Sequence, residues 1–92
     1  MSDERFSSIW DAIEDTPENA ENMKIRAALM RAIEGRIRAE GWSQTEAARR
    51  LGVTQPRVSD LMRGKVDLFS IDALVNMVAS TGLHVSVDVR AA

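Results

Sequence analysis

The sequence predicts a small, mainly α-helical domain of five helices, followed by one C-terminal β-strand. Two observations support the helices: apolar residues recur at helical spacing, and most of these stretches are bounded by a capping residue and a glycine. A third supports the strand, because apolar and polar residues alternate over residues 83–90. The chain of 92 residues has room for one such domain.

The first two expected helices precede the basic centre of the chain. One covers residues 6–13, where the apolar stripe consists of Phe6, Ile9, Trp10 and Ile13. The other begins after Thr16, with Pro17 in the first helical position, and runs to about residue 40 before Gly41 ends it. Its buried face is expected to hold Ile25, Leu29, Ala32, Ile33 and Ile37.

Three shorter helices follow, each with its own start and stop signals. Their N-caps are Ser43, Thr54 and Ser70, and their terminating glycines are Gly52, Gly64 and Gly82. Ser43 and Glu46 have the spacing of a reciprocal capping box. The expected inward side chains are Ala47, Ala48, Leu51, Val58, Leu61, Met62, Ile71, Leu74, Val75, Val78 and Ala79.

The C-terminal segment has a different period. Its apolar row consists of Leu83, Val85, Val87 and Val89. No second strand is expected in this chain, so we predict that the strand pairs with its copy in a homodimer. The alternative is an extended, frayed tail. The predicted organisation is an acidic segment (1–15), a domain (16–82) and a dimerisation strand (83–92).

The distribution of charge points to nucleic acid despite a net charge of −2. Residues 1–22 carry seven acids and one base, residues 23–66 carry ten bases and four acids, and residues 67–92 carry three acids and one base. A basic body between acidic ends suits a polyanionic partner at its centre.

The absence of cysteine, of a long apolar run and of a signal-peptide core predicts a soluble, cytoplasmic protein.

Residues 43–65 have the pattern of a helix-turn-helix: two short helices, a glycine turn at Gly52, a small Ala48 at the crossing and Val58 in the angle. The second helix would present its first turn to the major groove of double-stranded DNA. The predicted DNA-binding residues are Gln44, Thr54, Gln55, Arg57, Asp60, Arg63 and Lys65.

The expected roles follow from side-chain chemistry. Gln55 can bond adenine through paired hydrogen bonds, and Arg57 suits either guanine, bonded in the same way, or a phosphate. Arg63 and Lys65 suit backbone phosphates. Asp60 either accepts from a cytosine amino group or orients an arginine. Arg49 and Arg50 remain open between phosphate contacts and exposed helix surface.

The stretch GWSQTEAARRLGVTQPRVSDLMRGK, residues 41–65, resembles the phage-repressor (Cro/C1, or XRE) type of helix-turn-helix. The resemblance implies a lambda-repressor-like fold, a phosphate contact at Gln44 and base contacts from Thr54, Gln55 and Arg57, with Asp60 one turn further on. Two positions depart from the pattern. Pro56 replaces a residue that often contacts DNA, and Asp60 is acidic where a neutral or basic reader is frequent.

A narrower resemblance covers nearly the whole chain. IWDAIEDTP at residues 9–17, the helix over 23–38, RGK at 63–65 and FS at 69–70 are similar to antitoxins of HigA type. Such antitoxins dimerise, repress their own operon and neutralise a RelE/HigB-like RNA-cleaving toxin, which is small and basic. The implied toxin anchors are Phe6, Ile9, Trp10 and Ile13. The alternatives are that this stripe packs on the long helix of its own domain, and that the chain is a stand-alone XRE-type regulator.

Catalysis is not expected. The single histidine, His84, lies on the polar side of the predicted strand, and no Gly-rich phosphate loop or metal-ligand spacing is present. We therefore expect no enzyme activity, no metal and no cofactor. A protein-interaction module without DNA binding is a third reading, against which the polar residues of the motif speak.

Overall fold

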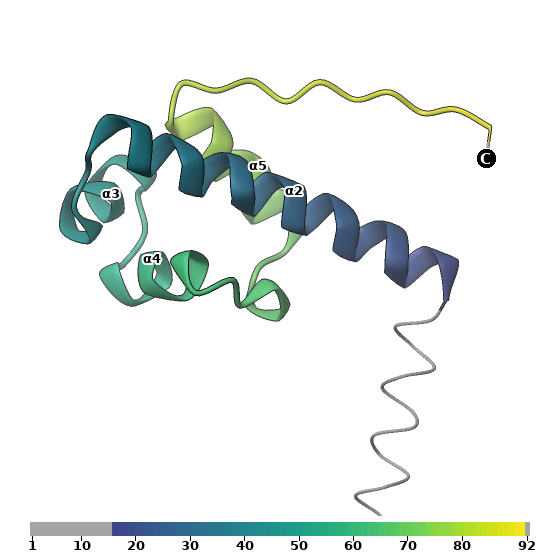
Figure 1. Cartoon of the computed structure of the whole chain (residues 1–92), viewed down its shortest axis with the longest axis horizontal. Helices are drawn as coiled ribbons and strands as arrows, with labels where there is room; N and C mark the ends of the chain where they lie inside the picture. Colours follow the sequence, from purple (N-terminus) through teal and green to yellow (C-terminus); the bar gives the residue numbers. More distant parts are fainter. Residues whose placement is uncertain (1–15, 92) are drawn as a thin grey trace, which may run out of the picture.

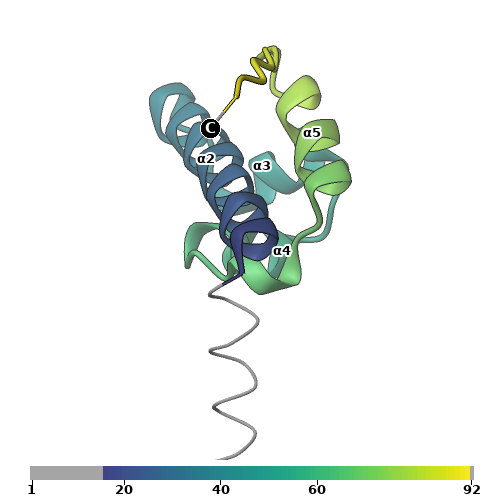
Figure 2. The ribbon, with the colours of Figure 1, turned by 90° about the vertical axis from the view of Figure 1, so that its right-hand side faces the viewer.

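The computed structural model describes residues 16–91. In this part of the chain there are four α-helices and one 3-10 helix: α2 (Pro17–Glu40), α3 (Gln44–Leu51), α4 (Gln55–Met62), η1 (Val66–Leu68) and α5 (Ile71–Ser80). The long α2 lies beside α5, and α3 packs against α4 (Figures 1 and 2). In the described range none of the helices has a stretch long and apolar enough to cross a bilayer.

The four helix starts predicted within residues 16–91 are confirmed. The side chains of Thr16, Ser43, Thr54 and Ser70 each accept a hydrogen bond from the backbone N–H three residues later. The ends of α2 and α3 are also confirmed, because Gly41 and Gly52 both adopt φ of 70°. Glycine enters this left-handed region without the steric cost that a Cβ atom brings. These local signals therefore place the helix boundaries close to where the sequence predicts them.

The core lies between α2, α5 and the α3–α4 pair. Its buried side chains are Met30, Ile33, Ile37, Ala47, Ala48, Leu51, Val58, Leu61, Phe69, Leu74, Met77 and Val78. The predicted face of α2 is partly wrong, since Ile25 is 41% exposed and Ala32 is exposed, whereas Met30 is buried. Met30, Ile33 and Ile37 form the inner stripe at i, i+3 and i+7.

Two arginines of α2 extend this inner side with polar contacts. Arg26 donates from Nη1 to the carbonyl oxygen of Val66 at 3.0 Å, and Arg36 donates from Nε to that of Thr81 at 3.1 Å. These carbonyls belong to η1 and to the end of α5. The long helix thus holds the later elements by apolar packing and by charge-assisted hydrogen bonds.

The prediction of five helices and a C-terminal strand is wrong. Residues 16–91 contain four α-helices and no β-strand, and the helix expected over residues 6–13 lies outside the described part. Residues 83–91 follow an extended course along one side of α2 (Figure 1). Their alternation resembles a strand, but no other extended segment in residues 16–91 lies alongside to form a ladder, and a strand is defined by such a ladder.

Candidate nucleic-acid interface

The unit formed by α3, the turn at Gly52 and α4 has a compact inner side. Ala47, Leu51 and Val58 are buried at the contact between the two helices. The N–H of Val53 donates to the carbonyl oxygen of Ala48 at 3.0 Å, which closes the end of α3 and directs the chain into α4. The small Ala48 is itself buried, as the close crossing of the helices requires.

The polar residues at the two helix starts are exposed. Gln44 is the first residue of α3, Thr54 caps α4 and Gln55 opens α4. The Thr54 hydroxyl accepts from the Arg57 N–H at 3.4 Å, so this oxygen is partly committed to the cap. The structure therefore leaves Gln44 and Gln55 projecting from helix N-termini, where free N–H groups and the helix dipole favour an anion.

The Arg57 side chain does not lie with the exposed residues at the start of α4. Its Nη1 donates to the carbonyl oxygen of Leu68 at 2.8 Å, and its guanidinium carbon lies 4.2 Å from the centre of the Phe69 ring. The side chain is half-buried between α4 and the segment that leads into α5. In this structure Arg57 is bound to its own chain rather than directed outward with Gln55.

Three charged residues lie near or just beyond the C-terminal end of α4. The carboxylate of Asp60 lies 3.6 Å from Lys65 Nζ, and the backbone N–H of Lys65 donates to the Asp60 carbonyl oxygen at 3.1 Å. Arg63 caps α4 and is exposed, and it has no ion-pair or hydrogen-bond partner for its side chain among residues 16–91. Asp60 is thus partly neutralised by Lys65, while the charge of Arg63 is available.

Arg49 and Arg50 of α3, whose roles the sequence leaves open, both contact the same acidic residue. Arg49 and Arg50 both donate to the Glu46 carboxylate, with Arg50 Nε at 2.7 Å. The hydrogen bond from Arg49 contributes most to holding the pKa of Glu46 below its ordinary value; desolvation opposes this and Arg50 adds to it. Arg50 also lies over the Trp42 ring, 4.7 Å from its centre. Because Glu46 bonds these arginines, only the Ser43 half of the predicted capping box forms.

The half-buried Ser59 was not among the predicted contact residues, although its position in α4 makes it a candidate. It follows Gln55 by one turn and lies on the side of α4 opposite the buried Leu61. Pro56 and Arg63 flank it on the same outward side. The signal was available, because the positions of Val58 and Leu61 fix which side of this helix faces solvent.

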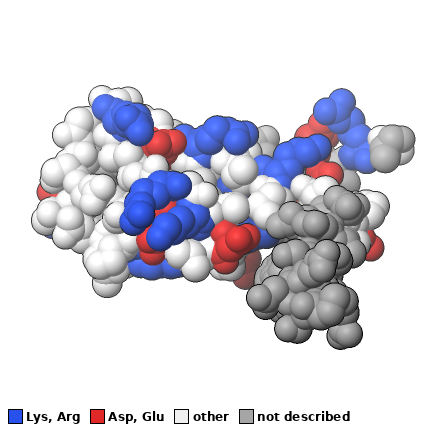
Figure 3. Space-filling model, turned by 60° about the horizontal axis from the view of Figure 1, so that its bottom comes forward, with Lys and Arg blue, Asp and Glu red and all other residues white. Residues whose placement is uncertain are grey.

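The surface around α3 and α4 carries Lys and Arg side chains near its middle, with acidic side chains beside them (Figure 3). Its exposed bases at the motif are Arg49, Arg50, Arg63 and Lys65. Among residues 16–91 no group of three His, Cys, Asp or Glu side chains is placed to hold a metal ion. The chemistry that this face offers is hydrogen bonding and positive charge.

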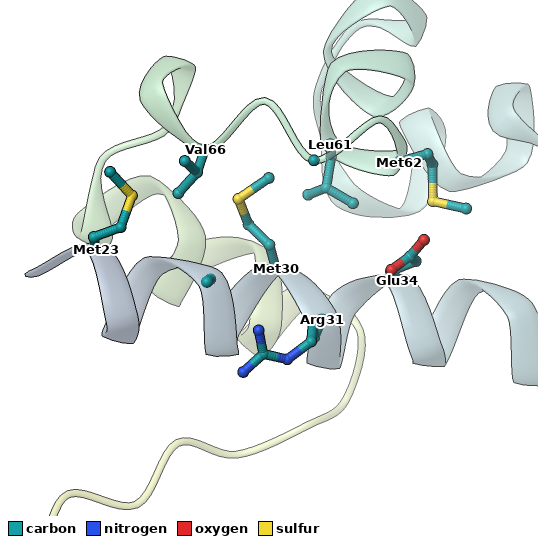
Figure 4. A pocket seen from close by; sticks show the side chains of 9 residues that line it. Met23, Met30, Arg31, Glu34, Leu61, Met62 and Val66 are labelled. Atoms are coloured by element: carbon teal, nitrogen blue, oxygen red, sulfur yellow. The ribbon is translucent and has the colours of Figure 1, made fainter. Parts of the chain in front are cut away.

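An apolar groove of about 360 Å³ lies between α2 and the end of α4. Met23, Met30 and Met62 face into it with Leu61 and Val66, whereas Arg31 points away (Figure 4). Flexible thioethers adapt to varied apolar surfaces. The groove therefore suits an apolar segment better than a charged ligand.

Other predicted contact residues lie outside this face. Phe6, Ile9, Trp10 and Ile13 fall outside the described residues. Leu83 and Val85 pack against the core, whereas Val87 is 79% and Val89 is 87% exposed. The apolar row of the C-terminal segment therefore starts over the domain and continues beyond its edge.

Two helices joined by a tight turn, with the second helix exposing its first turn, define a DNA-binding domain of the helix-turn-helix class. The chain belongs to the helix-turn-helix domain family, whose model matches residues 12–90. It is also 31% identical to a solved structure described as an XRE family transcriptional regulator, with a TM-score of 0.74 over 80% of this chain and 83% of the other. No curated protein matches the chain. The protein is a DNA-binding transcriptional regulator of the XRE family.

Proposed function

We propose that the protein is a sequence-specific repressor that binds a near-palindromic operator in its own operon. The observation that carries this proposal is the exposed start of α4, where Gln55 stands free of the packing that holds Val58 and Leu61. Glutamine in the major groove reads adenine through two hydrogen bonds. Gln44 at the start of α3 would add a phosphate contact that sets the orientation of the domain.

The test compares the affinity of the full chain for its upstream region with that for a shuffled sequence of equal length and composition. Tighter binding to the upstream region is expected, and the Gln55→Ala variant should lose most of that preference. Asn76→Ala, an exposed change on α5, is the matched control and should keep it. Equal affinity of the wild-type protein for both sequences would contradict the proposal.

We propose that the working form is a homodimer. Val87 and Val89 expose apolar side chains beyond the domain edge, and Val75 adds a partly exposed valine on α5. A shallow hollow of about 200 Å³ lies between α5 and the start of the C-terminal segment, lined in part by Val75, Leu83 and Val85. Burying this row against a second copy would remove apolar surface from water.

Sedimentation equilibrium tests this proposal, with a mass of twice the 10.2 kDa chain expected. Val87→Asp should weaken the dimer, while Ser86→Asp, which adds the same charge at the neighbouring position, should leave it intact. A monomeric wild-type protein at the concentrations that bind DNA would rule out the homodimer.

We further propose that the protein is the antitoxin of a type II toxin-antitoxin pair. The support is the resemblance to HigA-type antitoxins together with the acidic, apolar-striped segment 1–15, which suits a small basic toxin. Trp10 would be the main anchor, because buried aromatic side chains dominate such interfaces. On the sequence grounds given above, we propose a binding function without catalysis.

The alternative role for the stripe is packing on α2, where the methionine-lined groove offers an apolar surface. Co-expression with the product of an adjoining small basic reading frame distinguishes the two. The antitoxin proposal predicts a complex that Trp10→Ala weakens and that Ser8→Ala leaves unchanged. If no complex forms and Trp10→Ala instead lowers the stability of the free protein, the chain is a stand-alone regulator with a self-packed stripe.

A further inference from the structure

The contacts of Arg57 separate it from the outward-facing residues of α4. Its guanidinium donates to the Leu68 carbonyl oxygen at 2.8 Å and stacks 4.2 Å from the centre of the Phe69 ring. Phe69 is a core side chain with 2% of its surface exposed. The cation is therefore held against the domain on one face and by a backbone acceptor at its edge.

The position of Arg57 in the helix agrees with these contacts. Residues four apart lie on the same side of an α-helix, and Arg57 precedes the buried Leu61 by four. Pro56, Ser59 and Arg63 follow the opposite side. Arg57 thus lies on the flank of α4 that faces η1, not on the side that would enter a groove.

The segment that Arg57 holds is also held from α2. Arg26 Nη1 donates to the carbonyl oxygens of Val66 at 3.0 Å and of Phe69 at 3.5 Å, and Arg57 donates to the carbonyl oxygen of Leu68, which lies between them in the chain. Two arginines from different helices therefore fix the same short stretch of backbone. Through this stretch the orientation of α4 is coupled to α2 and to the start of α5.

We infer that Arg57 is a positioning residue that sets the angle at which α4 is presented to DNA, and that it reads no base itself. The inference rests on the DNA binding proposed above. A guanidinium can stack on a ring while donating in its own plane, whereas a lysine ammonium offers only a point charge. The DNA bases are then recognised by Gln55 and by the side of α4 that carries Ser59.

The test compares Arg57→Gln with Arg63→Gln, because each removes one positive charge from the same helix. Affinity for the upstream region is measured across salt concentrations, base preference is measured on single-substitution operators, and thermal unfolding is followed in parallel. Log K falls as log salt rises, and the loss of one phosphate contact reduces the steepness of that fall by about 0.9. Arg63→Gln is expected to show that loss with unchanged stability.

Arg57→Gln is expected to lower affinity about tenfold, with the wild-type salt slope, the wild-type base preference and a lower unfolding temperature. A slope reduced as in Arg63→Gln, or a preference lost at one operator position, would overturn the inference. If Arg57→Gln does not fold, Arg57→Lys decides: weaker binding at an unchanged slope supports positioning, and wild-type affinity overturns it. A wild-type protein without preference for the upstream region would instead show that the proposed function is wrong.

Discussion

Arg36 Nε lies 3.1 Å from the carbonyl oxygen of Thr81 and donates to it. The contact joins the C-terminal part of α2 to the residue that caps the end of α5. Thr81 is buried, and its hydroxyl donates to the Val78 carbonyl oxygen at 2.7 Å. Carbonyls at a helix end lack intrahelical donors, so a cation at this point satisfies an acceptor and complements the helix dipole.

Replacement of Arg36 by alanine should therefore lower the free energy of unfolding by about 1.5 kcal/mol, since a charge-assisted hydrogen bond to a buried residue is lost. Urea denaturation measures the change. Arg38→Ala is the matched control, because Arg38 is exposed on the same helix and its side chain bonds Glu34 alone among residues 16–91. Equal effects of the two substitutions would show that the Thr81 contact adds nothing.

Ser43 caps α3 through a hydrogen bond from the Glu46 N–H at 3.1 Å. Ser43→Ala should destabilise the protein by about 1 kcal/mol, as the loss of an N-cap does elsewhere. Thr45→Ala, two residues into the same helix and exposed, should be neutral or slightly stabilising because alanine is the better helix former. Chemical denaturation of both variants checks the prediction, which fails if Ser43→Ala matches the wild-type protein.

The buried face of α2 can be tested with two isoleucines. Ile33 is fully buried and Ile25 is 41% exposed. Ile33→Ala should cost about 3 kcal/mol through lost burial and a residual cavity, whereas Ile25→Ala should cost less than about 1 kcal/mol. Similar losses at the two positions would mean that the stripe containing Ile25 is buried after all.

The ion pairs of Glu46 make a pH-dependent contribution to stability. Its pKa in the folded protein is lowered, chiefly by the hydrogen bond from Arg49. A group with a lowered folded pKa stabilises the folded state above its unfolded value, here 4.5, and loses that contribution as the pH falls through the folded value. Glu46→Gln should therefore be less stable than wild type at pH 7, and the difference should shrink as the pH is lowered from 4.5 toward 3. Urea unfolding at both pH values measures this, and a difference that is independent of pH would contradict it.

The helix starts were predictable because they depend on local chemistry. Thr16, Ser43 and Thr54 cap their helices through side chains that need only a backbone N–H three residues away. The structure of the C-terminal segment was not predictable in this way. A strand forms only beside a partner strand, and the alternation of residues after Gly82 does not indicate whether such a partner exists. The buried face of α2 was only partly predictable. Met30 and Ile25 are both apolar, and only the placement of α5 and η1 decides which is buried.

The sequence predicted which residues belong to the candidate DNA-binding site, but not the directions in which their side chains point. Gln44, Gln55 and Arg63 are exposed as a DNA contact requires, and their roles stay predictions. Arg57 was chosen because arginine suits guanine, but residue chemistry alone does not reveal that the Leu68 carbonyl and the Phe69 ring compete for it. Those partners are 11 and 12 positions further along the chain, so only the fold brings them to Arg57.

Sequence-specific reading by the exposed start of α4 is tested most directly by selecting bound fragments from a random double-stranded DNA library. The wild-type protein should enrich a near-palindromic motif with half-sites about 10 base pairs apart, or a multiple of that spacing. Gln55→Ala should enrich a motif that has lost its preference at one position in each half-site, with the others kept. Enrichment of the same motif by both proteins, or of no motif by the wild type, would contradict this account.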